Sequence, residues 1–129
     1  MTARLHALVW IVTGPGPLRD GLHTLLASIP GVEITGEMAD VALIVQVCNT
    51  HRPDLVVLDA GLPGGEAWKA IKDIKGKWPQ AHCIVLADDG HQAQRARAIC
   101  ADTVLQKGMP APALVQTIEA VLWQGKCAE

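Results

Sequence analysis

An aspartate at the end of an apolar run is the residue of this chain best placed to do chemistry. Asp59 follows the branched apolar residues 55–58 and precedes a loop rich in glycine and proline at 60–65. An apolar run without polar alternation is typical of a strand buried on both faces of a parallel sheet. The carboxyl end of such a strand lies in the crevice where open α/β sheets bind ligands. Asp59 is therefore either a functional carboxylate or the cap of the following turn, since aspartate is also common in turns.

Other charged residues follow two further apolar runs. Lys107 comes directly after residues 103–106, and Asp88 and Asp89 come directly after residues 83–87. If these runs are parallel strands, their carboxyl ends meet at the same edge of the sheet as Asp59. Asp88 and Asp89 are expected to cap the next helix, with substitute metal ligation as the alternative.

Cysteines and histidines show no spacing typical of a metal site. The four cysteines are far apart and form no C-x-x-C, so we interpret them as reduced thiols of a cytosolic protein: Cys48, Cys83, Cys100 and Cys127. The five histidines are also scattered. The apolar run at 7–12 is too short for a secretory signal or a membrane span. We therefore expect a cytoplasmic protein without a resident cofactor or membrane association.

Strand-like and helix-like segments alternate five times along the chain. Apolar runs predict strands at 5–12, 32–36, 55–59, 83–87 and 103–106. Apolar residues at helical spacing predict helices at about 18–29, 40–50, 66–75, 92–100 and 112–124. Alternation at these lengths indicates the α/β class, a three-layer doubly wound five-stranded parallel sheet of (βα)5 type.

Two of the predicted helices depart from the usual single apolar stripe. The helix at 40–50 is apolar almost all round, so it is either well buried or presents one side to a partner. The helix at 92–100 is polar and rich in alanine, which predicts a loosely held element.

Composition limits the classes of function. A length of 129 residues predicts one domain, 1–129, and a hydrophobic fraction of 50% supplies a core. The net charge is −2, without a basic patch, which argues against direct binding of nucleic acid by this segment. Phe and Tyr are absent, so a stacking platform for single strands is not expected.

Several motifs together resemble the response-regulator receiver domain of two-component signalling. They are the run 52–59 ending in Asp59, the Leu-Pro-Gly at 62–64, the segment 18–22, and Leu-Gln-Lys at 105–107. The resemblance covers nearly the whole chain and is to the branch whose receivers precede helix-turn-helix output domains. It implies a flavodoxin-like sheet of strand order 2-1-3-4-5, with the site between strands one and three.

The resemblance assigns roles to three residues. In that family an aspartate after strand three accepts a phosphoryl group from a histidine kinase, an acidic pair after strand one helps to hold Mg²⁺, and a hydroxyl and a lysine bind the phosphoryl oxygens. By this resemblance Asp59 is the phosphoacceptor and, with Gly61, a metal ligand. Lys107 is the matching lysine, and we expect it to form a direct ion pair with Asp59.

Several positions depart from the family pattern. Thr13 and Gly14 replace the acidic pair, Ala87 replaces the hydroxyl, and Val104 replaces the aromatic switch residue of strand five. Mg²⁺ prefers carboxylate oxygens in an octahedral array. Phosphoryl transfer depends on positioning and charge neutralisation, and one lost donor costs on the order of 3–4 kcal/mol. The metal site is therefore predicted to be weak or absent.

Three functions stay open at this stage. The first is a degenerate receiver that acts through protein contacts with weak or no Mg²⁺-dependent phosphorylation. The second is a working phosphoacceptor at Asp59. The third is a small-molecule-binding flavodoxin-like module that uses the loop 13–16, although Pro15 within this loop and Pro17 directly after it remove backbone donors. The expected partners are a histidine kinase or a downstream effector or output domain, with a homodimer left open, and no enzyme activity is expected.

Overall fold

The computed structural model describes residues 7–14, 16–38, 53–61, 66–98 and 103–124. The helix predicted at 40–50, with its unusual apolar surface, lies outside the described residues, as do Cys48, Cys100 and Cys127. Within the described residues, no helix is both long enough and apolar enough to span a membrane.

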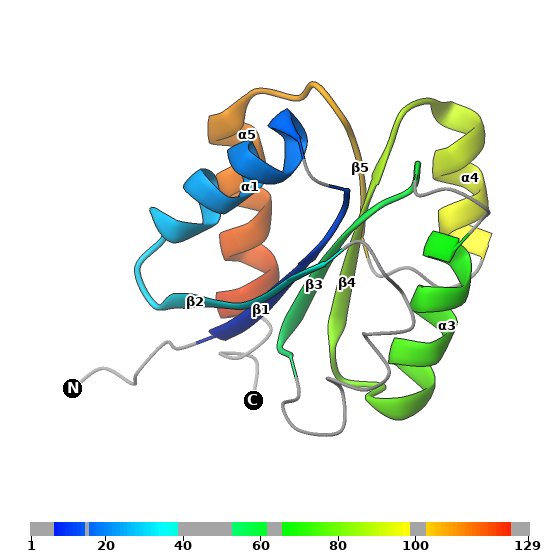
Figure 1. Ribbon diagram of the computed structural model, residues 1–129, viewed down its shortest axis with the longest axis horizontal. Helices are drawn as coiled ribbons and strands as arrows, with labels where there is room; N and C mark the ends of the chain where they lie inside the picture. Colours follow the sequence, from blue (N-terminus) through cyan, green and yellow to red (C-terminus); the bar gives the residue numbers. More distant parts are fainter. Residues whose placement is uncertain (1–6, 15, 39–52, 62–65, 99–102, 125–129) are drawn as a thin grey trace.

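Five parallel strands form one sheet in the order β2-β1-β3-β4-β5 (Figure 1). The strands are β1 (Ala7–Val12), β2 (Val32–Met38), β3 (Leu55–Asp59), β4 (His82–Ala87) and β5 (Thr103–Gln106). The predicted flavodoxin-like strand order is therefore confirmed. The order reverses between β1 and β3, and open α/β sheets bind ligands at the carboxyl ends of the strands at this point.

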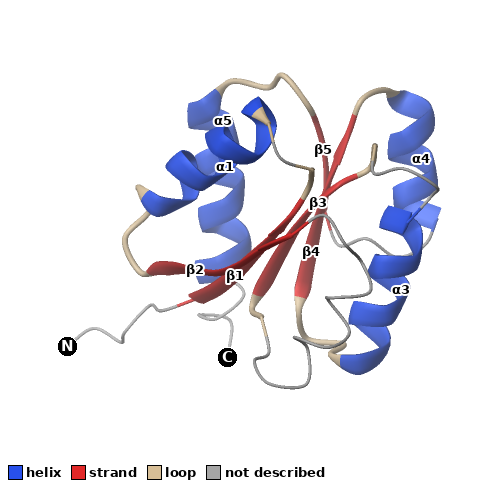
Figure 2. Ribbon diagram, in the orientation of Figure 1, coloured by secondary structure: helices blue, strands red, loops and turns tan. Residues whose placement is uncertain are grey.

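Helices cover both faces of the sheet and make three layers (Figure 2). On one face lie α1 (Pro17–Ala27) and α5 (Ala111–Glu119), which continues into a short π-helical turn, η2 (Ala120–Gln124). On the other face lie α3 (Glu66–Lys77) and α4 (Gly90–Ala98). The doubly wound α/β class predicted from the alternation of segments is confirmed.

The continuous apolar runs of the central strands are explained by burial on both sides. Successive side chains of a strand point to opposite faces, so Trp10 and Val56 pack towards α3, whereas Ile11 and Val57 pack towards α1 and α5. All four of these side chains are at most 1% exposed. The two apolar layers hold β1 and β3 firmly, and the loops that follow these strands therefore start from fixed positions.

Candidate functional site

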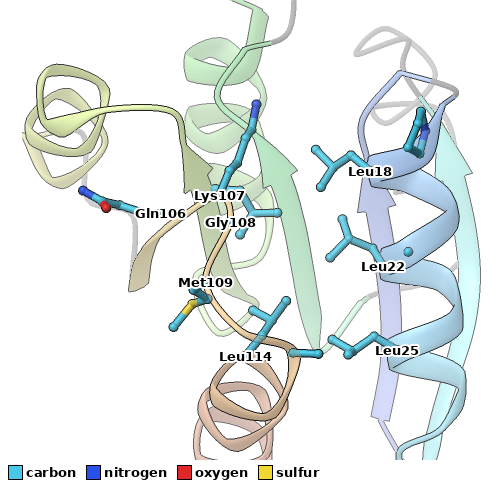
Figure 3. A pocket seen from close by; sticks show the side chains of 12 residues that line it. Leu18, Leu22, Leu25, Gln106, Lys107, Gly108, Met109 and Leu114 are labelled. Carbon is cyan, nitrogen blue, oxygen red and sulfur yellow. The ribbon is translucent and has the colours of Figure 1, made fainter.

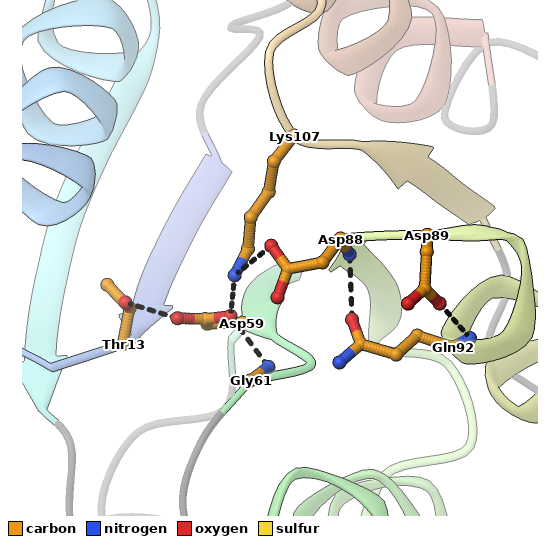
Figure 4. A network of polar contacts seen from close by, with 7 residues as sticks. All are labelled: Thr13, Asp59, Gly61, Asp88, Asp89, Gln92 and Lys107. Carbon is orange, nitrogen blue, oxygen red and sulfur yellow. Dashed lines mark hydrogen bonds and ion pairs between the residues drawn. The ribbon is translucent and has the colours of Figure 1, made fainter.

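Polar side chains from four different strand ends meet at the carboxyl edge of the sheet (Figure 4). Thr13 follows β1, Asp59 ends β3, Asp88 follows β4 and Lys107 follows β5. The register pairs Asp59 with Leu86 of β4, which brings the ends of these two strands to the same level. The fold thus brings together residues that are up to 94 positions apart in the chain, Thr13 and Lys107.

Asp59 is held by three groups. Its Oδ2 accepts a hydrogen bond from the Thr13 hydroxyl at 3.1 Å, and its Oδ1 accepts one from the Gly61 backbone N–H at 2.7 Å. The Lys107 Nζ lies 2.5 Å from the same Oδ1. The side chains of Asp59 and Lys107 are only 15% and 22% exposed. The ion pair expected from the sequence is therefore present and partly shielded from water.

Lys107 has a second carboxylate partner. Its Nζ lies 3.1 Å from Oδ1 of Asp88, whose side chain is 53% exposed. Partial burial of the ammonium lowers the pKa of Lys107, but its hydrogen bonds and charge attractions with Asp59 and Asp88 outweigh that effect, and the pKa is raised above the usual lysine value. The ammonium is thus a strongly held cation between two carboxylates.

Gly61 completes the packing around this cation. A Cβ added at Gly61 would lie 3.2 Å from Asp59 Oδ1, 3.3 Å from Lys107 Nζ and 3.5 Å from Asp88 Oδ2. These distances mean that a side chain here would push on the ion pair itself. A glycine at this position therefore lets the backbone approach both charged groups.

A second cation anchors the loop that precedes α1. The Arg19 guanidinium donates two hydrogen bonds to the backbone carbonyl of Thr13, from Nε at 3.2 Å and from one terminal nitrogen at 2.6 Å. Thr13 is 2% exposed, and its hydroxyl and its carbonyl are held by Asp59 and Arg19, respectively. The sequence singled out the segment that contains Arg19 but gave no sign of this contact.

Asp88 and Asp89 have different roles at the start of α4. Asp89 Oδ1 accepts the backbone N–H of Gln92 at 2.9 Å, which is the helix-capping contact expected from the sequence. Asp88 instead pairs with Lys107, and its backbone N–H donates to the Gln92 side-chain oxygen at 2.7 Å. The pairing of Asp88 with Lys107 was not anticipated, because two adjacent aspartates after a strand look alike in the sequence.

The donors at this edge fit Mg²⁺ poorly. Thr13 and Gly14 bring no charge to the position after β1, and Ala87 is a fully buried side chain without a hydroxyl. Among the residues that the structure describes, no group of three or more His, Cys, Asp or Glu side chains is arranged to hold a metal ion. A divalent cation shared by Asp59 and Asp88 would have to displace the Lys107 ammonium, which already compensates both charges.

A cavity of about 230 Å³ lies beside this cluster, between α1 and the segment that joins β5 to α5 (Figure 3). Leu18, Leu22 and Leu25 of α1 form one wall, and Leu114 of α5 faces them. Lys107 lines the cavity with its aliphatic stem, while its ammonium points away towards Asp59. The cavity is therefore mainly apolar and offers no available charge to a phosphate group.

A family model and a solved structure both match this chain over most of its length. Residues 9–119 match the family model described as the response regulator receiver domain. A solved structure of a two-component response regulator of the LuxR family from Aurantimonas sp. SI85-9A1 is 27% identical, with a TM-score of 0.81, and covers 91% of this chain and 85% of that chain.

Two curated relatives are transcriptional regulators. The DNA-binding transcriptional activator DevR/DosR of Mycobacterium tuberculosis is 32% identical over 60% of this chain and 36% of its own length. The transcriptional regulatory protein DegU of Brevibacillus brevis is 26% identical over 83% of this chain and 46% of its own length. The chain thus spans less than half the length of these two relatives. With the family model matched over residues 9–119 and the expected fold and strand order in place, the chain belongs to the response regulator receiver domain family.

Proposed function

We propose that this receiver domain signals through protein contacts, with weak or no Mg²⁺-dependent phosphorylation of Asp59. The observation that carries the proposal is the position of the Lys107 ammonium between Asp59 and Asp88. The cluster compensates its own charge with a side chain, where a metal-dependent site would need several anionic ligands around the ion.

The environment of Asp59 supports the proposal in a second way. A carboxylate that attacks phosphorus meets a strongly anionic reagent, and neutralisation of that charge supplies much of the catalysis. Here the neighbour after β1 is the Thr13 hydroxyl, which donates to Asp59 but carries no charge. Ala87 provides no hydroxyl for the phosphoryl oxygens. Each missing donor of this kind costs on the order of 10²–10³ in rate.

A phosphorylation assay tests the proposal. The protein is incubated with acetyl phosphate or beryllofluoride, with and without Mg²⁺, and is analysed by intact mass and by tryptophan fluorescence. We expect that at most a small fraction of the protein gains a phosphoryl group in a Mg²⁺-dependent way, and that the fluorescence does not change. A nearly complete Mg²⁺-dependent gain that Asp59→Asn abolishes would instead establish the working phosphoacceptor.

A restored variant serves as the positive control. Thr13→Asp with Gly14→Asp returns the acidic pair, and Ala87→Thr returns the hydroxyl. If the proposal is correct, this triple variant gains Mg²⁺-dependent modification that the natural chain lacks. Equal modification of both proteins would show that the departures at these positions do not limit the chemistry.

The partners belong to the same proposal. DevR/DosR and DegU are named as transcriptional regulators, and this chain matches less than half of each. We infer that the domain regulates an attached or separate output protein, receives its input from a histidine kinase or another protein, and makes no direct contact with nucleic acid. A cytoplasmic location completes the proposal, because the buried thiol of Cys83 suits a reducing compartment, and a homodimer stays open.

A further inference from the structure

Asp88 lies at the junction between the charged crevice and α4. Its carboxylate pairs with Lys107 at 3.1 Å, and its backbone N–H donates to Oε1 of Gln92 at 2.7 Å. Gln92 in turn donates its backbone N–H to Asp89 at 2.9 Å. An unbroken series of polar contacts therefore runs from Asp59 through Lys107 and Asp88 to the first turn of α4 (Figure 4).

The start of α4 has few other attachments. Of the five side chains described between His91 and Arg95, only Ala93 is buried. Arg95 lies over the ring of Trp68 on α3, with its guanidinium carbon 5.2 Å from the ring centroid. A contact of this kind is modest when exposed to water. With so little apolar anchoring, the polar contacts of Asp88, Asp89 and Gln92 have a large share in setting the position of this helix.

We propose that Asp88 is a positioning residue that couples the charge at Asp59 to the stability of the first turn of α4. The Lys107 ammonium is shared by the carboxylates of Asp59 and Asp88, so a change of charge at one carboxylate alters the attraction between the ammonium and the other. When Asp59 loses its charge, Lys107 pairs with Asp88 alone and steadies the segment from Asp88 to Gln92. When Asp59 gains negative charge, it draws the ammonium away and repels Asp88, which loosens that segment.

This coupling goes beyond the proposed function and does not depend on it. It requires only that the total charge in the crevice around Asp59 can change. A modification of this carboxylate or the approach of a charged group of a partner would produce such a change. It also provides a polar route from the crevice to the surface in a chain where Val104, half-buried on β5, replaces the aromatic residue expected at that position.

Amide hydrogen exchange measured by NMR tests the proposal. The reporters are the backbone amides of Gln92 and Ala93, which donate to the side chain and the carbonyl of Asp89. The amide of Ile84 in β4 reports global unfolding. Ion pairs of this exposure shift equilibria by up to about fivefold. We therefore expect Asp59→Asn to slow exchange at Gln92 and Ala93 about two- to fivefold relative to Ile84, and Lys107→Met to speed it.

The decisive comparison repeats Asp59→Asn in an Asp88→Asn background, and again in an Asp88→Ala background. The proposal predicts that the effect of Asp59→Asn on α4 disappears in both. Asp89→Ala should speed exchange because it removes the oxygen that caps α4, yet it should preserve the response to Asp59→Asn. Asp20→Asn removes an exposed carboxylate on α1 and serves as the control. It should change neither the exchange rates of Gln92 and Ala93 nor their response to Asp59→Asn. An unchanged response without Asp88, or no response in the natural background, would overturn the proposal.

Discussion

Substituting Asp59 and Lys107 singly and together should reveal a measurable coupling energy between the two side chains. Two unit charges about 2.5–3 Å apart attract by roughly 6 kcal/mol at an effective dielectric constant of 20, and desolvation and side-chain ordering offset most of this. Exposed pairs are worth about 0–1 kcal/mol, whereas breaking a buried pair costs about 3–5 kcal/mol. Because Asp59 and Lys107 are 15% and 22% exposed, we expect a coupling of about 1–3 kcal/mol.

The two single substitutions should differ in cost. Lys107→Ala leaves both Asp59 and Asp88 without their cation, so it should lower the free energy of unfolding by about 1–3 kcal/mol. Asp59→Asn leaves Lys107 paired with Asp88. The amide oxygen can still accept the hydrogen bond of the Gly61 N–H, while the amide NH2 can donate to the Thr13 hydroxyl oxygen. That substitution should cost no more than about 1 kcal/mol.

The assay is a double-mutant cycle of Asp59→Asn and Lys107→Ala, with unfolding by urea at neutral pH. A repeat at acidic pH, well below the ordinary aspartate pKa of about 3.9, is the control, because the coupling should disappear when Asp59 is neutral. A coupling near zero at neutral pH, or a larger cost for Asp59→Asn than for Lys107→Ala, would refute the reasoning from the shared cation.

Three further predictions concern the same cluster and its supporting layers. Because the pKa of Lys107 is raised in the folded protein, the stabilisation of the fold by its ammonium is complete below the unfolded lysine pKa of about 10.4 and is lost as the pH rises through the higher folded pKa. Urea unfolding at increasing alkaline pH should show this loss of stability, and the Lys107→Met variant should not show it. Gly61→Ala should lower the free energy of unfolding by about 1 kcal/mol, because its Cβ would press on Asp59 and Lys107, and the coupling between those residues should fall with it. Ile71→Ala in α3, at 0% exposure, should cost about 2–5 kcal/mol in the same assay while leaving the coupling unchanged.

The sheet could be predicted from the sequence because its central strands are buried on both faces. The bounds of β3 and β5 agree with the expected 55–59 and 103–106, and the resemblance supplied the strand order. Helix ends were less certain: α4 begins at Gly90, two residues before the expected start, because Asp89 already caps it. The residues at which a helix begins and ends depend on such individual contacts, and the spacing of apolar residues does not predict them.

The candidate site was predictable only in part, for a similar reason. Asp59 and Lys107 each follow an apolar run, so the topology alone placed them together. The role of Asp88 depends on which of two adjacent side chains turns towards Lys107, and that choice is made by the backbone at the end of β4. The contact of Arg19 with the Thr13 carbonyl depends on the angle at which α1 leaves the crevice. Neither orientation leaves a signal in residue type or spacing.

The dependence of stability on Mg²⁺ tests most directly whether the Lys107 ammonium has taken the place of a metal. Free energies of unfolding are measured by urea in millimolar Mg²⁺ and in EDTA, for the natural chain, Asp59→Asn and the Thr13→Asp, Gly14→Asp variant. A metal present at 100 times its Kd would add about 2.7 kcal/mol. We predict no difference for the natural chain and a clear gain for the variant with the restored acidic pair. A gain of that size in the natural chain, abolished by Asp59→Asn, would contradict the central claim.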